Sequence, residues 1–166
     1  MNIERAVGEM LADRGEYVAT AESCTGGLIG SLLTDIPGAS DYFDRSIVTY
    51  SYDAKLEDLG VPREILDAEG AVSEPVAEQM ARGVRDHAGV TWGVATTGIA
   101  GPEGGSEGKP VGTVYIGVAR AADWGTGDSW WSVERYVFDG SRTEIKRQIA
   151  VQALEDLKTA AASEPR

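Results

Sequence analysis

Apolar residues in the first half of the chain recur with two different spacings, which predict helices that alternate with strands. The apolar positions in residues 2–14 and 28–33 follow the period of a helix with one apolar face. The short apolar run at 17–21 (YVATA) is typical of a buried strand, and the run at 45–51 (RSIVTYS) predicts a second strand. A short helix within 53–60, ended by a glycine, follows the second strand.

The second half continues this alternation. A short helix is predicted over 62–68, and Ser73 stands where the N-cap of a helix running to His87 would be. A strand at 90–98 (VTWGVATTG) precedes a long loop at 99–112 that is rich in glycine and proline.

The end of the chain predicts a β-hairpin and a final helix. Strand-like runs at 113–120 and 129–138 flank a segment of turn-forming residues. A helix is predicted over 141–160, and residues 161–166 are expected to be a frayed tail. The helix would direct four apolar side chains inward: Ile145, Ile149, Ala153 and Leu157. Early alternation followed by a hairpin predicts a layered α/β domain with a mixed sheet.

Length, charge and hydropathy then narrow the class of protein. A chain of 166 residues suits one domain that buries about 70% of its unfolded surface. The net charge of −12 argues against nucleic acid as a partner, because phosphate backbones require many Lys and Arg residues. No stretch reaches the ~20 apolar residues of a membrane span, and the N-terminus has no apolar signal core. We therefore expect a cytoplasmic protein without membrane association.

Cysteine and histidine are too scarce for several kinds of site. A single cysteine, Cys24, excludes an internal disulfide framework and a cysteine-rich zinc site. The single histidine, His87, leaves little for metal ligation or for a histidine-based catalytic triad. We therefore expect neither a metal nor a cofactor.

Three polar segments, two of which contain glycines, lie at the ends of predicted strands, at 22–27, 50–55 and 97–112. Ligands of open α/β sheets bind at the carboxyl ends of the strands. These three segments therefore predict one shared site at that edge of the sheet.

The first segment, within AESCTGG, is a strand-to-helix turn that contains Thr25, Gly26 and Gly27. Free backbone N–H groups at such a turn can hold an anion, or stabilise an oxyanion beside a hydroxyl group. Its spacing is not that of a P-loop or of a G-x-S-x-G elbow. The alternative is that Ser23 or Thr25 is a simple N-cap.

Ser23 and Cys24 are adjacent candidates for a nucleophile. A thiolate would need an imidazole, but His87 is expected at the solvated end of a distant helix. A serine can instead use a lysine that burial keeps neutral, and Lys55 begins a helix on the candidate face. Lys55 could equally be a surface lysine among acidic residues, so the sequence leaves both interpretations open.

The third segment, TTGIAGPEGGSEGKPVG, holds six glycines, two prolines and one lysine, Lys109. Such a composition fixes an irregular backbone and favours a functional loop over a merely flexible one.

These motifs together resemble the CinA C-terminal domain family, which includes nicotinamide mononucleotide deamidases. The resemblance runs in order from about residue 5 to 158 and rests on five stretches: AESCTGG, VTYSYDAKLEDLGV, GAVSEPVAEQMARGVR, TTGIAGPEGGSEGKPVGTVYIGVA and FDGSR. It implies a three-layer α/β/α fold with a mixed, mostly parallel sheet. We accordingly expect residues 1–166 to form one such domain, in its standalone form.

The resemblance also implies roles for individual residues. Ser23 of ESCTGG would be the nucleophile, Lys55 its base, and Tyr50 would assist by a hydrogen bond to either. Thr97 and Gly98 of TTGIAGP would line the substrate pocket.

Arg142 corresponds to the arginine of the F-x-G-D-R segment of the family, although Ser141 stands here where aspartate is usual. Arg142, Lys109 and the N–H groups of the glycine-rich turns are then the candidates for binding the phosphate of the mononucleotide. The oxyanion hole would be formed by N–H groups within 24–27 or at 97–98.

The implied function is hydrolysis of the carboxamide of nicotinamide mononucleotide by serine acyl transfer, in a protein that we expect to be a homo-oligomer. Two other functions stay open. One is a nucleotide-sensing or partner-binding domain without turnover, and the other is an amidase for a different small amide.

Overall fold

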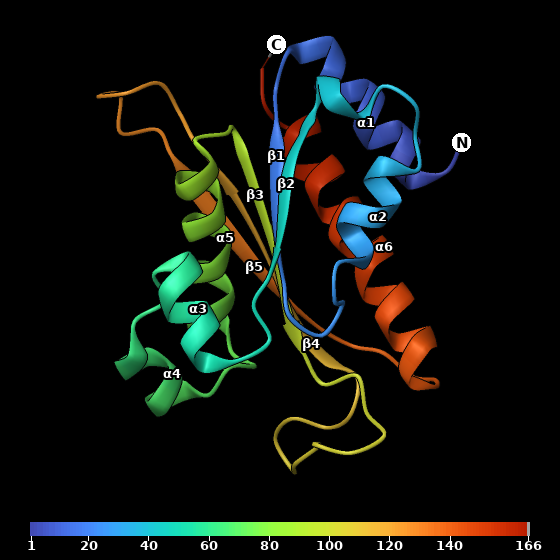
Figure 1. Cartoon of the computed structure of the whole chain (residues 1–166), viewed down its shortest axis with the longest axis vertical. Helices are drawn as coiled ribbons and strands as arrows, with labels where there is room; N and C mark the ends of the chain where they lie inside the picture. Colours follow the sequence, from blue (N-terminus) through green and yellow to red (C-terminus); the bar gives the residue numbers. More distant parts are fainter. Residues whose placement is uncertain (166) are drawn as a thin grey trace.

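A five-stranded sheet lies at the centre of the protein in a computed structural model that describes residues 1–165 (Figure 1). The strands are β1 (Val18–Glu22), β2 (Phe43–Val48), β3 (Trp92–Gly98), β4 (Thr113–Arg120) and β5 (Trp130–Val137), in the order β2-β1-β3-β4-β5. Strand β1 pairs in parallel with β2 and β3, whereas β4 is antiparallel to both β3 and β5. Because β5 thus runs in the direction of β3, the predicted mixed and mostly parallel sheet is confirmed.

Helices cover both faces of this sheet, which confirms the three-layer α/β/α architecture (Figure 1). One face carries α1 (Ile3–Arg14), α2 (Leu28–Thr34) and α6 (Arg142–Ala162). The other carries α3 (Tyr52–Leu59), α4 (Arg63–Glu69) and α5 (Glu74–Ala88). A single 3-10 turn (Ala39–Asp41) precedes β2.

Two apolar cores hold the layers together. The first lies under α1, α2 and α6, and its fully buried members include the predicted inward positions of α6: Ile145, Ile149, Ala153 and Leu157. The second packs α5 on β1 and β3 through Val76, Met80 and Val84. Helix α5 lies so close to β3 that a Cβ on Gly93 would be 2.1 Å from the carbonyl oxygen of Ala81, which explains the glycine at that position.

Three local predictions differ from the structure. Strand β2 ends at Val48, so residues 49–51 form the connection to α3 rather than part of the strand. Ser73 occupies the N-cap position of α5, but its hydroxyl donates to the carbonyl of Gly70 and does not cap the helix. The final helix continues to Ala162, with Ala161 buried, so the tail begins later than predicted.

The carboxyl ends of β1, β2 and β3 meet at one edge of the sheet, beside the loop 99–112 and the first turn of α6 (Figure 1). All three polar segments singled out in the sequence begin at this edge.

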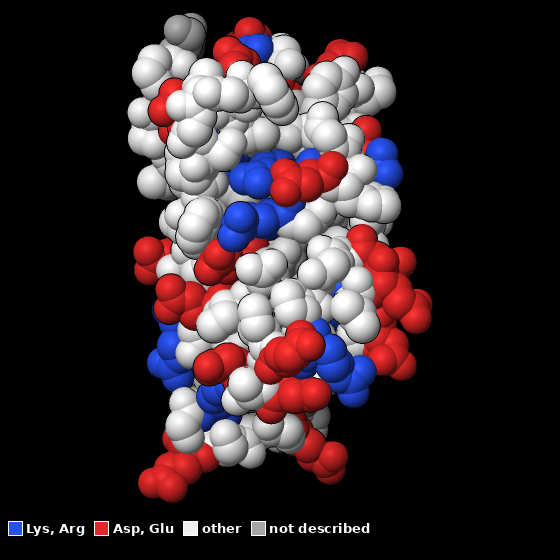
Figure 2. All heavy atoms as spheres, turned by 90° about the vertical axis from the view of Figure 1, so that its left-hand side faces the viewer, with Lys and Arg blue, Asp and Glu red and all other residues white. Residues whose placement is uncertain are grey.

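Acidic groups are spread over the face that carries α3, α4 and α5, whereas basic groups gather there in a few small patches (Figure 2). Within residues 1–165, no helix is both long and apolar enough to cross a membrane. The same residues contain no group of His, Cys, Asp and Glu side chains arranged to hold a metal ion.

Candidate active site

Ser23 and Lys55 meet where β1 ends. Ser23 is the first residue after β1, half-buried, and its N–H donates to the carbonyl of Thr96 on β3 (3.1 Å). Lys55 lies in the first half of α3 with only 1% of its surface exposed. Its Nζ donates to the Oγ of Ser23 (3.1 Å) and to the carbonyl of Thr49 (2.6 Å).

Burial makes Lys55 an unusual lysine. Removal from water lowers the pKa of its ammonium group from 10.5 to about 8, because a buried site disfavours the charged form. No carboxylate contacts its Nζ among the residues that the structure describes. About a tenth of the amine is therefore neutral at pH 7 and most of it at pH 9, and the neutral amine is the state that a general base requires.

Cys24, next to Ser23 in the chain, is poorly suited to act as a nucleophile. Its side chain is 5% exposed, and burial raises the pKa of the thiol to about 11 against the opposing charges of Lys55, Lys146 and Arg142. His87 is exposed at the end of α5, as predicted. Cys24 is therefore a protonated core residue, and Ser23 is the better-placed nucleophile.

Glu22, the last residue of β1, organises the turn that follows it. Its fully buried carboxylate accepts six hydrogen bonds. Three come from backbone N–H groups at the start of α2, at Gly27 (3.1 Å), Ile29 (2.9 Å) and Gly30 (3.1 Å). The other three come from hydroxyl groups, at Thr20 (3.1 Å), Thr25 (2.8 Å) and Ser46 (2.6 Å).

This arrangement corrects the expectation that the glycine turn offers free N–H groups to a ligand. The N–H of Gly27 is bound to Glu22, and that of Gly26 donates to the carbonyl of Ser23 (3.1 Å). Both glycines have positive φ angles, +62° and +98°, which the tight turn requires. Within residues 1–165, the N–H groups of Cys24 and Thr25 donate to no other residue, so these two are the candidates left in the turn for an oxyanion hole.

The other predicted pocket residues also have internal contacts. The Oγ of Thr25 lies 3.0 Å from the Oγ of Thr96, in addition to its bond with Glu22. The hydroxyl of Thr97 donates to the carbonyl of Ala71 (2.7 Å). A Cβ on Gly98 would lie 2.8 Å from the carbonyl oxygen of Thr113, so packing against β4 already accounts for this glycine.

Tyr50, just after β2, and Arg142, the first residue of α6, contact each other. The guanidinium of Arg142 donates to the hydroxyl of Tyr50 (2.9 Å) and to the carbonyl of Gly101 (2.6 Å). The expected bond from Tyr50 to Ser23 or Lys55 is therefore replaced by one with Arg142. Tyr50 is 63% exposed.

Ser141 gives Arg142 a defined position although it replaces the usual aspartate. Its hydroxyl accepts from the N–H of Glu144 (3.3 Å), whose carboxylate accepts from the N–H of Ser141 (2.7 Å). This capping box fixes the first turn of α6.

Two further lysines are candidates for the site. Lys109 is held at the end of α4, whereas Lys146 lies beside the turn that follows Ser23. The Nζ of Lys109 donates to the carbonyl of Glu69 at the end of α4 (3.1 Å). The Nζ of Lys146 lies 3.7 Å from where a Cβ on Gly26 would be. Lys146 was not predicted from the sequence, although its spacing of four residues from Arg142 placed both on one face of a helix. No role was predicted for Glu22 either.

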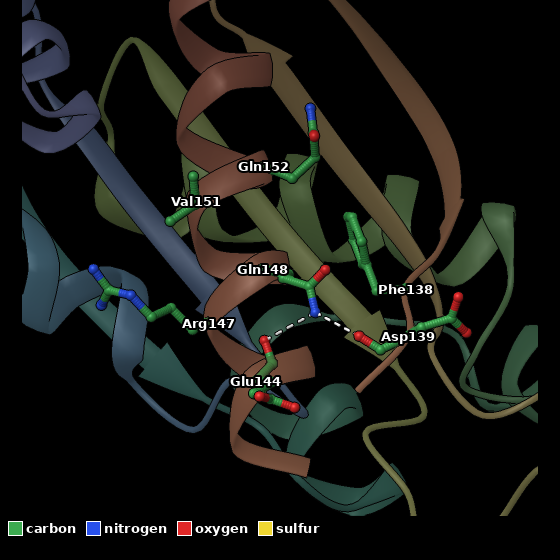
Figure 3. Close-up of a pocket in the computed structure, with 7 residues that line it drawn as sticks. All are labelled: Phe138, Asp139, Glu144, Arg147, Gln148, Val151 and Gln152. Carbon is green, nitrogen blue, oxygen red and sulfur yellow. Dashed lines mark hydrogen bonds between the residues drawn. The ribbon is translucent and has the colours of Figure 1, made fainter. Parts of the chain in front are cut away.

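A separate hollow of about 650 Å³ lies between the end of β5 and α6 (Figure 3). There, Phe138 and Gln148 face one another, and the amide of Gln148 donates to the carbonyls of Asp139 (2.9 Å) and Glu144 (3.2 Å). Its described lining residues include no serine, cysteine, lysine or histidine, so they offer no hydroxyl, thiol or amine nucleophile.

The chain is similar to known proteins over nearly its whole length. The model of the family described as CinA C-terminal domain matches residues 1–161. A "CinA-like protein" of Chlorobium limicola is 49% identical over 95% of this chain, which spans 36% of that relative's length. The "Nicotinamide-nucleotide amidohydrolase PncC" of Shigella flexneri is 46% identical over 95% of this chain and 92% of its own.

Solved structures of the superfamily have the same fold. The competence/damage-inducible protein CihA of Agrobacterium tumefaciens is 41% identical, with a TM-score of 0.85 over 97% of this chain and 96% of its own. A CinA superfamily protein of Klebsiella pneumoniae is 31% identical, with a TM-score of 0.88 over 99% of this chain and 100% of its own.

Proposed function

The chain belongs to the CinA C-terminal domain family, and on this premise we propose that it hydrolyses the carboxamide of nicotinamide mononucleotide to nicotinate mononucleotide and ammonia. The relative named as a nicotinamide-nucleotide amidohydrolase supports this substrate, because it matches this chain over nearly its whole length. The observation that carries the proposal is the contact between the Oγ of Ser23 and the Nζ of a buried Lys55.

The first chemical step is attack by Ser23 on the carboxamide carbon. Neutral Lys55 keeps one N–H on the carbonyl of Thr49, while its lone pair accepts the hydroxyl proton of Ser23. The contact at 3.1 Å is within the reach required of a general base. As the C–O bond forms, the carbonyl oxygen becomes an oxyanion, for which the N–H groups of Cys24 and Thr25 are available.

The second step is departure of ammonia. The ammonium form of Lys55 returns its proton to the leaving nitrogen, the C–N bond breaks, and an acyl ester on Ser23 remains. Water then attacks this ester with Lys55 again acting as the base, which releases nicotinate mononucleotide and regenerates Ser23. Every proton transferred in this cycle passes through the amine of Lys55.

The discriminating experiment is release of ammonia from nicotinamide mononucleotide by the purified protein, measured at low and at high salt because of the net charge of −12. We expect turnover that disappears in Ser23→Ala. Binding of the nucleotide without ammonia release by the wild type would instead support a sensing module. Release of ammonia from other small amides, but not from the mononucleotide, would support a different amidase.

A further inference from the structure

The substrate in the proposed function carries a phosphate, and the protein must bind it against its own net charge of −12. The start of α2 does not supply the attraction. Three of its N–H groups donate to Glu22, and this buried carboxylate adds a negative charge directly behind the turn. The phosphate must therefore be met by cationic side chains.

The four lysines of the chain differ in their availability for this role. Lys55 is buried and bound to Ser23 and Thr49, and Lys109 donates to the carbonyl of Glu69. Lys158 lies towards the far end of α6, in a hollow that it shares with Met1 and Asp13. Lys146 is the lysine that faces the nucleophile turn with its ammonium group free.

Three observations define the position of Lys146. Its Nζ lies 3.7 Å from where a Cβ on Gly26 would be, so the absence of a side chain at Gly26 leaves this ammonium group open towards the turn. Its side chain is partly exposed, and among residues 1–165 it has no hydrogen-bond or ion-pair partner. Arg142, four residues earlier on α6, lies on the same face of the helix.

We propose that Lys146 binds the phosphate of the mononucleotide and thereby makes the enzyme prefer a nucleotide to the corresponding nucleoside. This inference rests on the proposed function. Arg142 is the obvious competitor for the role, but two of its nitrogens already hold Tyr50 and Gly101. Lys146 can give all three of its N–H groups to the ligand.

The kinetic test compares nicotinamide mononucleotide with nicotinamide riboside, which lacks the phosphate. Lys146→Ala should raise KM for the mononucleotide by about 10-fold to 100-fold, the range expected for loss of a charge-assisted hydrogen bond. Its kcat on either substrate and its KM for the riboside should stay within about two-fold. Lys158→Ala removes the same charge from the far end of α6 and should change neither kcat nor KM for either substrate. Equal losses on both substrates, or no loss on either, would overturn the role.

A binding measurement separates this inference from the proposed reaction. In the Ser23→Ala background, calorimetry should show tighter binding of the mononucleotide than of the riboside, and Lys146→Ala should abolish that difference. Lys146→Arg, which keeps the charge, should retain most of it. If the wild type releases no ammonia but the difference in affinity depends on Lys146, the reaction is wrong and the phosphate site holds. If ammonia is released but Lys146 leaves the difference unchanged, the site is wrong and the reaction holds.

Discussion

The Nζ of Lys55 lies 3.1 Å from the Oγ of Ser23, although the two residues are 32 positions apart in the chain. The parallel pairing of β1 with β2 produces this contact. Glu22 stands opposite Val48, and the N–H of Thr49 continues the ladder to the carbonyl of Glu22 (2.9 Å). The chain then enters α3, whose first turns bring Lys55 back over the end of β1. Sheet register therefore brings the proposed nucleophile and base together.

Substitution of Ser23 and of Cys24 by alanine should show which of these adjacent residues is the nucleophile. We expect Ser23→Ala to lower kcat for ammonia release by about 10³-fold or more, because Lys55 hydrogen-bonds to no other hydroxyl group in the described part of the chain. Cys24→Ala should retain most of the activity, since burial keeps this thiol protonated at neutral pH. The two variants are compared by steady-state ammonia release. An active Ser23→Ala together with an inactive Cys24→Ala would refute the serine assignment.

Activity should rise with pH through the pKa of Lys55. Burial lowers this pKa to about 8, so the amine is mostly charged at pH 7 and mostly neutral at pH 9. Only the neutral form accepts the proton of Ser23. The kcat/KM of the wild type should therefore increase about tenfold per pH unit below this pKa and level off above it. A profile that is flat between pH 6 and 9 would exclude Lys55 as the base.

Substitution by arginine tests the same role without removing the positive charge. Lys55→Arg cannot lose its proton in this pH range, so we expect it to be as inactive as Lys55→Ala, by about 10²-fold to 10⁴-fold. Lys158→Arg, at the distant end of α6, is the matched control and should be fully active. Circular dichroism and thermal unfolding check that both proteins are folded. Full activity of Lys55→Arg would leave Lys55 without a catalytic role.

The order of elements was predictable because it follows from local patterning. The apolar period of α6 and the glycine after α3 needed no tertiary information, and both were confirmed. The resemblance to the family supplied the number of layers. Local sequence had already made Ser23 and Lys55 candidates, and the resemblance favoured them over the alternatives of Cys24 as nucleophile and Lys55 as a surface lysine. Homo-oligomerisation stays a prediction.

Local sequence could not show which partner each polar side chain has. The carboxylate of Glu22 reaches Ser46 on the neighbouring strand, and the hydroxyl of Tyr50 reaches an arginine 92 residues away. Such contacts depend on strand order and on where helices cross, neither of which a local pattern determines. The turn was therefore predicted to have free N–H groups for an anion, whereas the carboxylate of Glu22 already accepts from some of them.

Glu22→Gln should lower both the stability of the protein and its kcat. A glutamine has the same shape, but its NH₂ group cannot accept the three hydrogen bonds that either carboxylate oxygen now receives. We expect the free energy of unfolding to fall by about 3 kcal/mol, which lowers Tm by roughly 6–12 °C in a domain of this size. Because the turn then loses its anchor, kcat should fall more than KM changes.

The matched control for that loss is Glu57→Gln, an exposed position on α3 where the same substitution should shift Tm by less than about 2 °C. Thermal unfolding and ammonia release are measured on the same preparations. If Glu22→Gln unfolds at the wild-type temperature, the six hydrogen bonds contribute little to stability, and the account of the turn fails.

Arg142 should contribute equally to the reaction of nicotinamide mononucleotide and of nicotinamide riboside, because we expect it not to bind the phosphate. Arg142 was one of the candidates for binding the phosphate in the sequence, but its guanidinium links the loop at Gly101 to the hydroxyl of Tyr50. Loss of these contacts frees the glycine-rich loop beside the site, whatever the substrate carries. We expect Arg142→Ala to lower kcat/KM for nicotinamide mononucleotide and nicotinamide riboside by similar factors, about 10-fold or more.

The control for Arg142→Ala is Arg147→Ala, which removes an exposed arginine of α6 that lines the other hollow and should leave both rates unchanged. The ratio of the two kcat/KM values decides the outcome. If Arg142→Ala leaves this ratio at its wild-type value, the arginine acts through the loop. If its loss is confined to the mononucleotide, Arg142 itself takes the phosphate. Because Arg142 and Lys146 share one face of α6, their double variant would then lose less than the sum of the two single losses if both bind the same phosphate group.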